Sequence, residues 1–344
     1  MHLFTRLCGL IALVAASVST HAGTPEQAAL EQFHQSIKVG YNTLTTETST
    51  LLRAASAYCE EPTTNHRKAL NKGWLDAFLA WQAVRFVNFG PVENNNLAWQ
   101  FQFWPDPKNL IARKAKTILK AEAPVTSNLI EQSGVAVQGF PMIEFLLFDE
   151  QQSIGQDALP APRSCELLIK VAEHVNHNTE ALASQWSDFR PHYLANALYQ
   201  ETTLKAGMTA LEILEERRLA QPMGLRGNGR RNPYIADAWR SGNSLKAAKA
   251  GVAGLQNHFL PGLTTLLDAR GESSLASRIR AQFNKVADNF PAADAPMQTL
   301  LGDDDRFRAL QGLYVDVSQL ATLVNDEAAV ALGVIRGFNS SDGD

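Results

Sequence analysis

Apolar side chains recur at steps of three and four residues in the first part of the chain, which is the spacing of one helix face. The row is interrupted once, at Thr48, and Pro62 follows its end. Because proline cannot continue a helix, the pattern predicts one long helix that stops before Pro62. The apolar members of this row are Leu30, Phe33, Ile37, Tyr41, Leu44, Leu51, Ala55 and Tyr58.

The helical period returns along the rest of the chain, whereas the alternating pattern of β-strands is scarce. Glycine, proline and asparagine separate the periodic segments. The sequence therefore predicts an all-α protein of two helical bundles, residues 23–190 and 191–344, joined near residues 186–196. The predicted helical segments after the first are 70–84, 109–122, 126–148, 165–189, 193–220, 244–259, 274–290 and 305–334.

Residues 1–22 have a different character. Arg6 is followed by an apolar stretch from Leu7 to Val18 and then by small residues up to Ala22. This order is typical of a cleavable signal peptide. The stretch is shorter than the ~20 apolar residues of a membrane span, and no later segment is long and apolar enough. We therefore expect a periplasmic mature protein without a transmembrane segment.

The charge of the chain bears on its partners, and its cysteine content predicts a covalent bond. The formal net charge is -4, and both signs are mixed along the chain, which argues against a nucleic-acid partner. Signal cleavage would remove Cys8 and leave Cys59 and Cys165. An even pair of cysteines in an oxidising compartment predicts a disulfide, with a lone reactive thiol as the alternative.

One acidic residue stands inside an apolar run, "GFPMIEFLLFDE", Gly139 to Glu150. A carboxylate enclosed by apolar side chains costs several kcal/mol unless it has a partner. Glu144 must therefore reach solvent or a polar group elsewhere in the fold. We expect a polar space between helices, with Arg85 as its counter-charge.

Other segments also carry polar residues that a plain helical bundle does not need. They are Arg85 and Glu93 after "WLDAFLAWQAV", Asp106 in "FQFWPDPKN", Glu144, and Asn339 and Asp342 in the closing "LGVIRGFNSSDGD". Together with the "WRSGNS" segment at Trp239 to Ser244, their order and spacing over nearly the whole mature chain resemble the imelysin-like family of bacterial envelope proteins.

That resemblance implies two bundles with approximate internal symmetry and a site at their interface. Members of the family are described as metallopeptidases and as parts of iron uptake, and the histidine and glutamate of their GxHxxE motif are proposed metal ligands. Here the motif runs from Gly139 to Glu144, and Pro141 occupies the histidine position. Proline supplies neither a ligand nor an N–H group.

The resemblance carries over a ligand site made of Arg85, Glu93, Asp106, Glu144, Asn339 and Asp342. Three acids would hold a metal: Glu93, Asp106 and Glu144. Oxygen ligands without imidazole suit a hard divalent or ferric cation better than a hydrolytic zinc site.

Structural interpretations of the same residues remain open. Glu144 and Arg85 could form an ion pair that binds nothing, and Asp106 could cap the helix that starts near Pro107. Asn339 and Asp342 could hydrogen-bond the tail to the fold.

Two further groups are weaker candidates. His174 and His177 could share a helical face without a third ligand. The loop "RGNGRRNP" could hold an anion through Arg226, Arg230 and Arg231, or lie solvated. No HExxH, G-x-S-x-G or phosphate-loop motif is present.

Three functions follow from these observations. The first is a non-enzymatic binding protein for a small ligand or metal ion, working with envelope components of iron uptake. The second is a metallopeptidase, which the missing motif histidine argues against. The third is a scaffold whose polar site is only structural.

Overall fold

The computed structural model describes residues 24–291 and 295–335, and this part of the chain is all-α, as predicted. Besides the α-helices, this part of the chain has four short helical segments of other types. Segments η1 Gly90–Asn96 and η3 Pro233–Ile235 are 3₁₀-helices, and η2 Ile213–Ala220 and η4 Thr322–Ala328 are π-helices. The α-helices are α1 Pro25–Glu60, α2 Thr64–Val84, α3 Leu97–Phe101, α4 Leu110–Lys120, α5 Ser127–Gln132, α6 Phe140–Phe148, α7 Glu150–Ile154, α8 Pro162–Ala195, α9 Leu198–Glu212, α10 Ser244–His258, α11 Leu260–Ala269, α12 Ser273–Asp288, α13 Met297–Gly302, α14 Asp304–Ala321 and α15 Ala329–Leu332.

Helix α1 has the buried face that its apolar spacing predicts. Thr24 caps its start, and Pro25 occupies the first turn, where a missing N–H costs nothing. Thr48 is buried on the same face, and its hydroxyl lies 2.8 Å from that of Thr179 on α8. The polar interruption of the apolar row is therefore a contact between two packed helices.

Two predicted segments have different ends in the structure. The segment 126–148 is divided into α5 and α6, because Gly134 shortly after α5 and Gly139 just before α6 both take a positive φ that interrupts the helix. Helix α8 continues through Pro191 to Ala195, although proline removes one helical hydrogen bond. Packing offsets that loss, since the Trp186 and Tyr193 rings are both buried, with centroids 5.7 Å apart.

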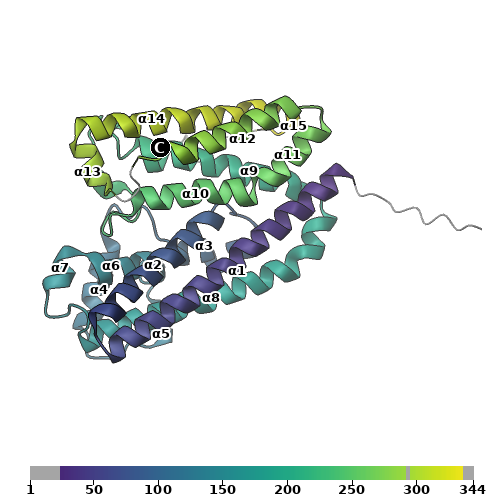
Figure 1. Ribbon diagram of the computed structural model, residues 1–344. Helices are drawn as coiled ribbons and strands as arrows, with labels where there is room; N and C mark the ends of the chain where they lie inside the picture. The colour runs from purple at the N-terminus through teal and green to yellow at the C-terminus, as the bar shows by residue number, and fades with distance from the viewer. Residues whose placement is uncertain (1–23, 292–294, 336–344) are drawn as a thin grey trace, which may run out of the picture.

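The helices form two layers (Figure 1). Helices α1 to α8 make the lower layer, where α1 packs against both α2 and α8, and the later helices make the upper one. The predicted limit at residue 190 falls inside α8, and the internal symmetry of the two halves stays a prediction.

The disulfide between Cys59 and Cys165 is confirmed. It joins the last turn of α1 to the first turn of α8, with 5.6 Å between the two Cα atoms. The bridge thus fixes one end of the longest helix pair in the lower layer.

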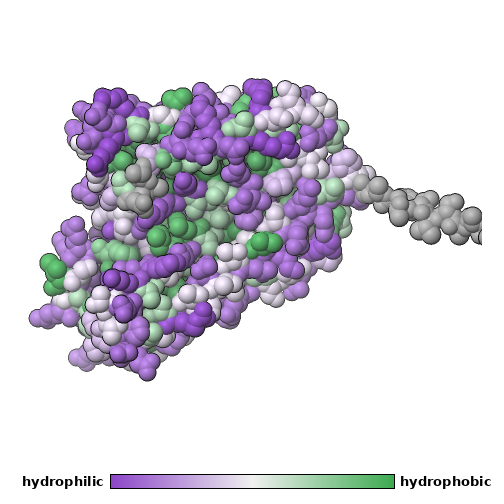
Figure 2. Space-filling view, in the orientation of Figure 1, coloured by the Kyte–Doolittle hydropathy of each residue, from purple (hydrophilic) through white to green (hydrophobic). Residues whose placement is uncertain are grey.

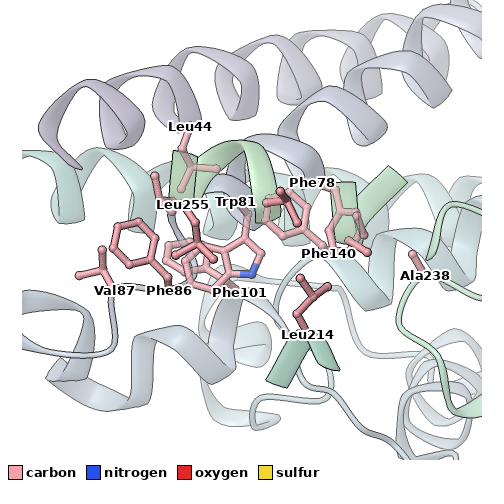
Figure 3. Close-up of a cluster of buried hydrophobic side chains, with 14 of the residues drawn as sticks. Leu44, Phe78, Trp81, Phe86, Val87, Phe101, Phe140, Leu214, Ala238 and Leu255 are labelled. Atoms are coloured by element: carbon pink, nitrogen blue, oxygen red, sulfur yellow. The ribbon is translucent and has the colours of Figure 1, made fainter. Parts of the chain in front are cut away.

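The two layers share one hydrophobic core. Helix α10 lies so close to α2 that a Cβ on Gly254 would stand 2.0 Å from the carbonyl oxygen of Ala83. Figure 3 shows Trp81 and Phe86 of the lower layer gathered with Leu214 and Leu255 of the upper layer. On the face in Figure 2, green residues collect between the layers, while purple residues cover much of both. The layers are therefore packed together by apolar contacts.

The predicted signal peptide and the predicted tail residues lie near the two ends of the chain. Residues 1–22, Asn339 and Asp342 lie outside the described residues, so the signal peptide and the tail site stay predictions. Among the helices that are described, none has the length and apolar character needed to cross a membrane.

Candidate functional site

Helix α6 is held in place at its first residue. Gly139 has φ 98°, and a Cβ there would lie 2.2 Å from the carbonyl oxygen of Gln100, so only glycine fits. The indole N–H of Trp74 donates to the carbonyl of Phe140 at 3.1 Å. Pro141, in the first turn, and Glu144, one turn later, both face the same cavity.

This cavity has a volume of about 370 Å³ and lies between the predicted halves. One side comes from α2, α4, α6 and the loop after α3, and the other from the segment 232–240. Its apolar walls are Trp74, Phe78, Phe103, Trp104, Pro105, Pro107, Ile111, Phe140, Pro141, Tyr234, Ile235, Ala236, Ala238 and Trp239. Its polar residues are Gln102, Asp106, Asn109, Glu144, Asn232, Asp237 and Arg240. Aromatic walls with a few polar groups are typical of a small-ligand site.

Glu144 is 4% exposed, and its partner is a backbone group of the upper layer. The N–H of Ser241 donates to its Oε1 at 2.8 Å. Burial raises the pKa of Glu144 to about 7, because a carboxylate loses its hydration there. The Ser241 hydrogen bond and the charge of Arg240 oppose that rise in pKa, and Asp237 adds to it. Near neutral pH this carboxyl can therefore exchange a proton or receive a cation.

Arg85 has another counter-charge than the one predicted. Its Nη1 lies 3.8 Å from Oδ2 of Asp237, and its Cζ lies 5.4 Å from the centroid of the Trp104 ring. Burial, aided by the nearby Arg218, lowers the pKa of Arg85 to about 9. The prediction that Arg85 pairs with Glu144 was wrong. The apolar periodicity of the sequence does not show which acidic residue lies nearest to Arg85 in the folded protein.

Asp106 lines the cavity and also caps α4. Its Oδ1 accepts from the N–H of Leu110 at 2.7 Å, and its Oδ2 accepts from that of Ile111 at 3.0 Å. The capping interpretation is thus observed, and both oxygens already have a donor.

Glu93 lies away from the cavity. Its side chain is exposed, and its Oε2 accepts from the N–H of Gly90 at 2.8 Å, within the turn that opens η1. Within residues 24–291 and 295–335, no three His, Cys, Asp or Glu side chains are grouped so as to hold a metal ion. The structure therefore does not bring Glu93, Asp106 and Glu144 together as one ligand set.

A buried polar network that the sequence analysis missed lies behind the cavity. Its centre is Asp237, 3% exposed, whose Oδ2 is 3.1 Å from Nη2 of Arg218. The indole N–H of Trp81 donates to Oε1 of Gln102 at 3.0 Å, as does the amide of Gln82 at 2.7 Å. These residues looked like ordinary helix and loop positions in the sequence. Only the nearby "WRSGNS" segment marked this stretch as unusual.

Arg240 ties the upper side of the cavity to the lower layer. Its Nε donates to Oδ2 of Asp149 at 2.9 Å, and its Nη2 donates to Oδ1 of Asn109 at 2.9 Å. Its guanidinium also lies 4.3 Å from the ring centroid of Trp239. A partly buried ion pair with an additional hydrogen bond restrains the guanidinium group, so Arg240 holds the segment 232–240 against the lower layer.

The histidine pair and the arginine-rich loop, the weaker site candidates from the sequence, form contacts within the fold. His174 is bonded to Gln100 at 3.0 Å, and burial lowers its pKa. Arg226 pairs with Glu216, and Arg231 donates to the carbonyl of Leu301 at 2.9 Å. These contacts stabilise the structure around each residue.

Comparisons with known proteins agree with the resemblance read from the motifs. A family model described as Imelysin (peptidase M75) matches residues 37–324. No curated protein sequence gives a significant match.

Two solved structures share the fold at low sequence identity. An imelysin-like protein from Psychrobacter arcticum 273-4 superposes with a TM-score of 0.78 at 19% identity, over 91% of this chain and 97% of that one. A protein described as an iron-regulated protein A precursor, from Parabacteroides distasonis ATCC 8503, gives a TM-score of 0.68 at 17% identity, over 88% and 95% of the two chains.

Proposed function

Since this chain belongs to the imelysin family, we propose that it is a periplasmic binding protein that handles iron or another cation. Its ligand would occupy the cavity between the lower-layer helices and the segment 232–240. A signal peptide at residues 1–22 would export it. The name of the iron-regulated neighbour supports the link to iron, and envelope components of iron uptake are the expected partners.

Glu144 is the observation that carries this proposal. It is a buried carboxyl on the wall of an aromatic cavity, and its hydrogen bond comes from a backbone N–H rather than from a cation. A positively charged ligand beside Glu144 would favour the ionised carboxylate and offset the cost of burying it. The surrounding aromatic faces would also attract a cation.

The donor set does not fit a resident metal centre with three protein ligands. Glu93 is outside the cavity, both oxygens of Asp106 accept helix N–H bonds, and Pro141 replaces the motif histidine. We therefore expect iron as cargo, bound weakly through Glu144 or carried in with ligands of its own. Asn339 and Asp342 lie outside the described residues and stay predicted ligand residues.

Calorimetric titration of iron(II) and of iron(III) citrate into the mature, metal-free protein at pH 6, 7 and 8 tests the proposal. Affinity for iron(II) should rise with pH up to about 7, by up to tenfold per pH unit, because this cation binds the ionised form of Glu144. Glu144→Gln should weaken binding at pH 8 at least tenfold and remove the pH dependence.

Glu150→Gln is the matched control, because Glu150 is an exposed acid at the start of α7. It should bind as the wild type does. Failure of the wild type to bind either probe would favour the scaffold alternative. Chelator-sensitive peptide hydrolysis that Glu144→Gln abolishes would favour the peptidase alternative.

A further inference from the structure

A second, smaller cavity has Arg85 on its wall and shares no lining residue with the main one. Its volume is about 60 Å³, which is room for a few heavy atoms. The polar side chains on its wall are Gln82, Arg85 and Arg218, and the other lining residues are Phe86, Ala210, Ile213, Leu214, Gly251 and Leu255. The wall of this cavity thus carries two guanidinium groups and no carboxylate.

The charges around the two arginines do not balance. Oδ2 of Asp237 is 3.1 Å from Arg218 and 3.8 Å from Arg85, and it also accepts from Gln102 at 3.4 Å. One carboxylate oxygen of Asp237 therefore forms ion pairs with two guanidinium groups and accepts a hydrogen bond from one amide. Arg217 adds a further positive charge near Arg85.

Arg85 is the group that this sharing leaves short of partners. Its Nη1 is buried, and no described residue accepts a hydrogen bond from it. Arg218 is better satisfied: Nη2 bonds to Oε1 of Gln82, and Nη1 donates to the carbonyl of Ala247 at 3.4 Å. A buried guanidinium donor without an acceptor costs free energy that an anion beside it would recover.

We propose that a small monovalent oxyanion, a carboxylate or bicarbonate of three or four heavy atoms, binds in this cavity between Arg85 and Arg218. A planar anion matches the planar fork of a guanidinium group. The other lining residues are apolar, except for Gln82, so the two guanidinium groups are the only charges on the wall. The π-helical winding of η2 supports the assignment, because it carries Arg218, and π-helical turns are frequent at functional sites. This site is separate from the cation cavity and does not depend on it.

Three variants isolate the site. Arg85→Gln removes the guanidinium that lacks an acceptor. Gly251→Ala keeps both arginines and places a Cβ on the wall of the cavity, 3.6 Å from Nη1 of Arg218, an ordinary contact distance. Arg270→Gln removes an exposed arginine after α11 and is the charge-matched control.

Thermal unfolding of the full mature protein is followed as formate or bicarbonate replaces gluconate at constant ionic strength. In the wild type and in Arg270→Gln, the midpoint should rise by about 2–3 °C when the anion exceeds its dissociation constant tenfold. Arg85→Gln and Gly251→Ala should lose most of this rise. The rise is compared within each variant, because alanine in a helix shifts the starting midpoint by itself.

Benzoate separates the small anion from the carboxylate end of a larger molecule, since a ring does not fit a cavity of about 60 Å³. It should leave the wild-type midpoint unchanged. Absence of a rise with formate and bicarbonate would mean that only water accepts from Arg85. An equal rise in Gly251→Ala, or with benzoate, would mean nonspecific binding to the surface. Either result overturns the assignment.

Discussion

At the scale of single residues, Gly139 controls where Glu144 lies. The backbone there has φ 98° and ψ -173°, a region that is nearly closed to other residues, and a Cβ at this position would clash with the carbonyl oxygen of Gln100. We expect Gly139→Ala to lower the free energy of unfolding by about 3 kcal/mol or more, because strain and a backbone clash add. Urea denaturation measures this loss.

Gly134→Ala provides the matched control for that experiment. Gly134 also has a positive φ, 81°, but a Cβ there would meet nothing within 4 Å. It should cost about 1 kcal/mol, from strain alone. Equal losses in the two variants would show that the contact between α6 and Gln100 does not hold the site.

The raised pKa of Glu144 also makes folding depend on pH. Its folded pKa is about 7 and the ordinary value is 4.5, so between these values the folded protein holds a proton that the unfolded chain has released. The stability contributed by this group is therefore present at low pH and lost as pH rises through 7. Relative to Glu144→Gln, the wild type should lose about 2–3 kcal/mol between pH 5 and pH 8.

Urea denaturation of both proteins at each pH, with a chelator present, gives this difference. Because other titrating groups are common to both proteins, their contributions cancel. A constant difference from pH 5 to pH 8 would mean that Glu144 is ionised throughout. Glu150→Gln should follow the wild type at each pH.

At the scale of elements, the first turn of α6 carries Pro141 where the family motif has histidine, and it keeps the motif glutamate as Glu144. Pro141 and Glu144 lie one turn apart, and both face the cavity. Pro141→His should place an imidazole beside Glu144, and nitrogen donors suit transition ions better than carboxylate oxygens alone. We expect zinc and iron(II) to bind at least tenfold tighter in calorimetric titrations, which corresponds to about 1.4 kcal/mol.

Glu144→Gln in both backgrounds is the control for that substitution. It should remove the gain, because the new imidazole would again stand alone. If Pro141→His folds and binds no more tightly than the wild type, the first turn of α6 is not a metal site that lacks one ligand.

At the scale of the whole molecule, the disulfide closes a long loop around the lower layer. Cys59 and Cys165 are 106 residues apart in the sequence. In the chain-entropy description, a loop of that length contributes about 4–5 kcal/mol by restricting the unfolded chain. Replacing both cysteines by serine should lower the free energy of unfolding by about that amount in urea denaturation. Two free thiols in the denatured, unreduced wild type would show that the bridge does not form.

The all-α class, the buried face of the long first helix and the expected disulfide could be read from the amino-acid sequence. Apolar side chains at steps of three and four residues leave a helix as the element that buries them all on one face. If the predicted signal peptide is removed, two cysteines remain, and only one pairing of them is possible. The helices follow from the spacing of residues that are close in sequence, and the disulfide follows from the number of cysteines. Neither inference requires knowledge of how the helices pack.

The partners of the charged residues could be identified only from the packing of the helices. Glu144 was recognised as a buried acid, but its partner, the N–H of Ser241, is 97 residues away. Asp237 likewise pairs with Arg218 of η2 in the upper layer and with Arg85, the residue after α2, in the lower layer. Helical periodicity reports which face of a helix is buried and not what lies opposite. Which polar residues line each cavity therefore depends on how α10, η2 and the segment 232–240 pack against the lower layer.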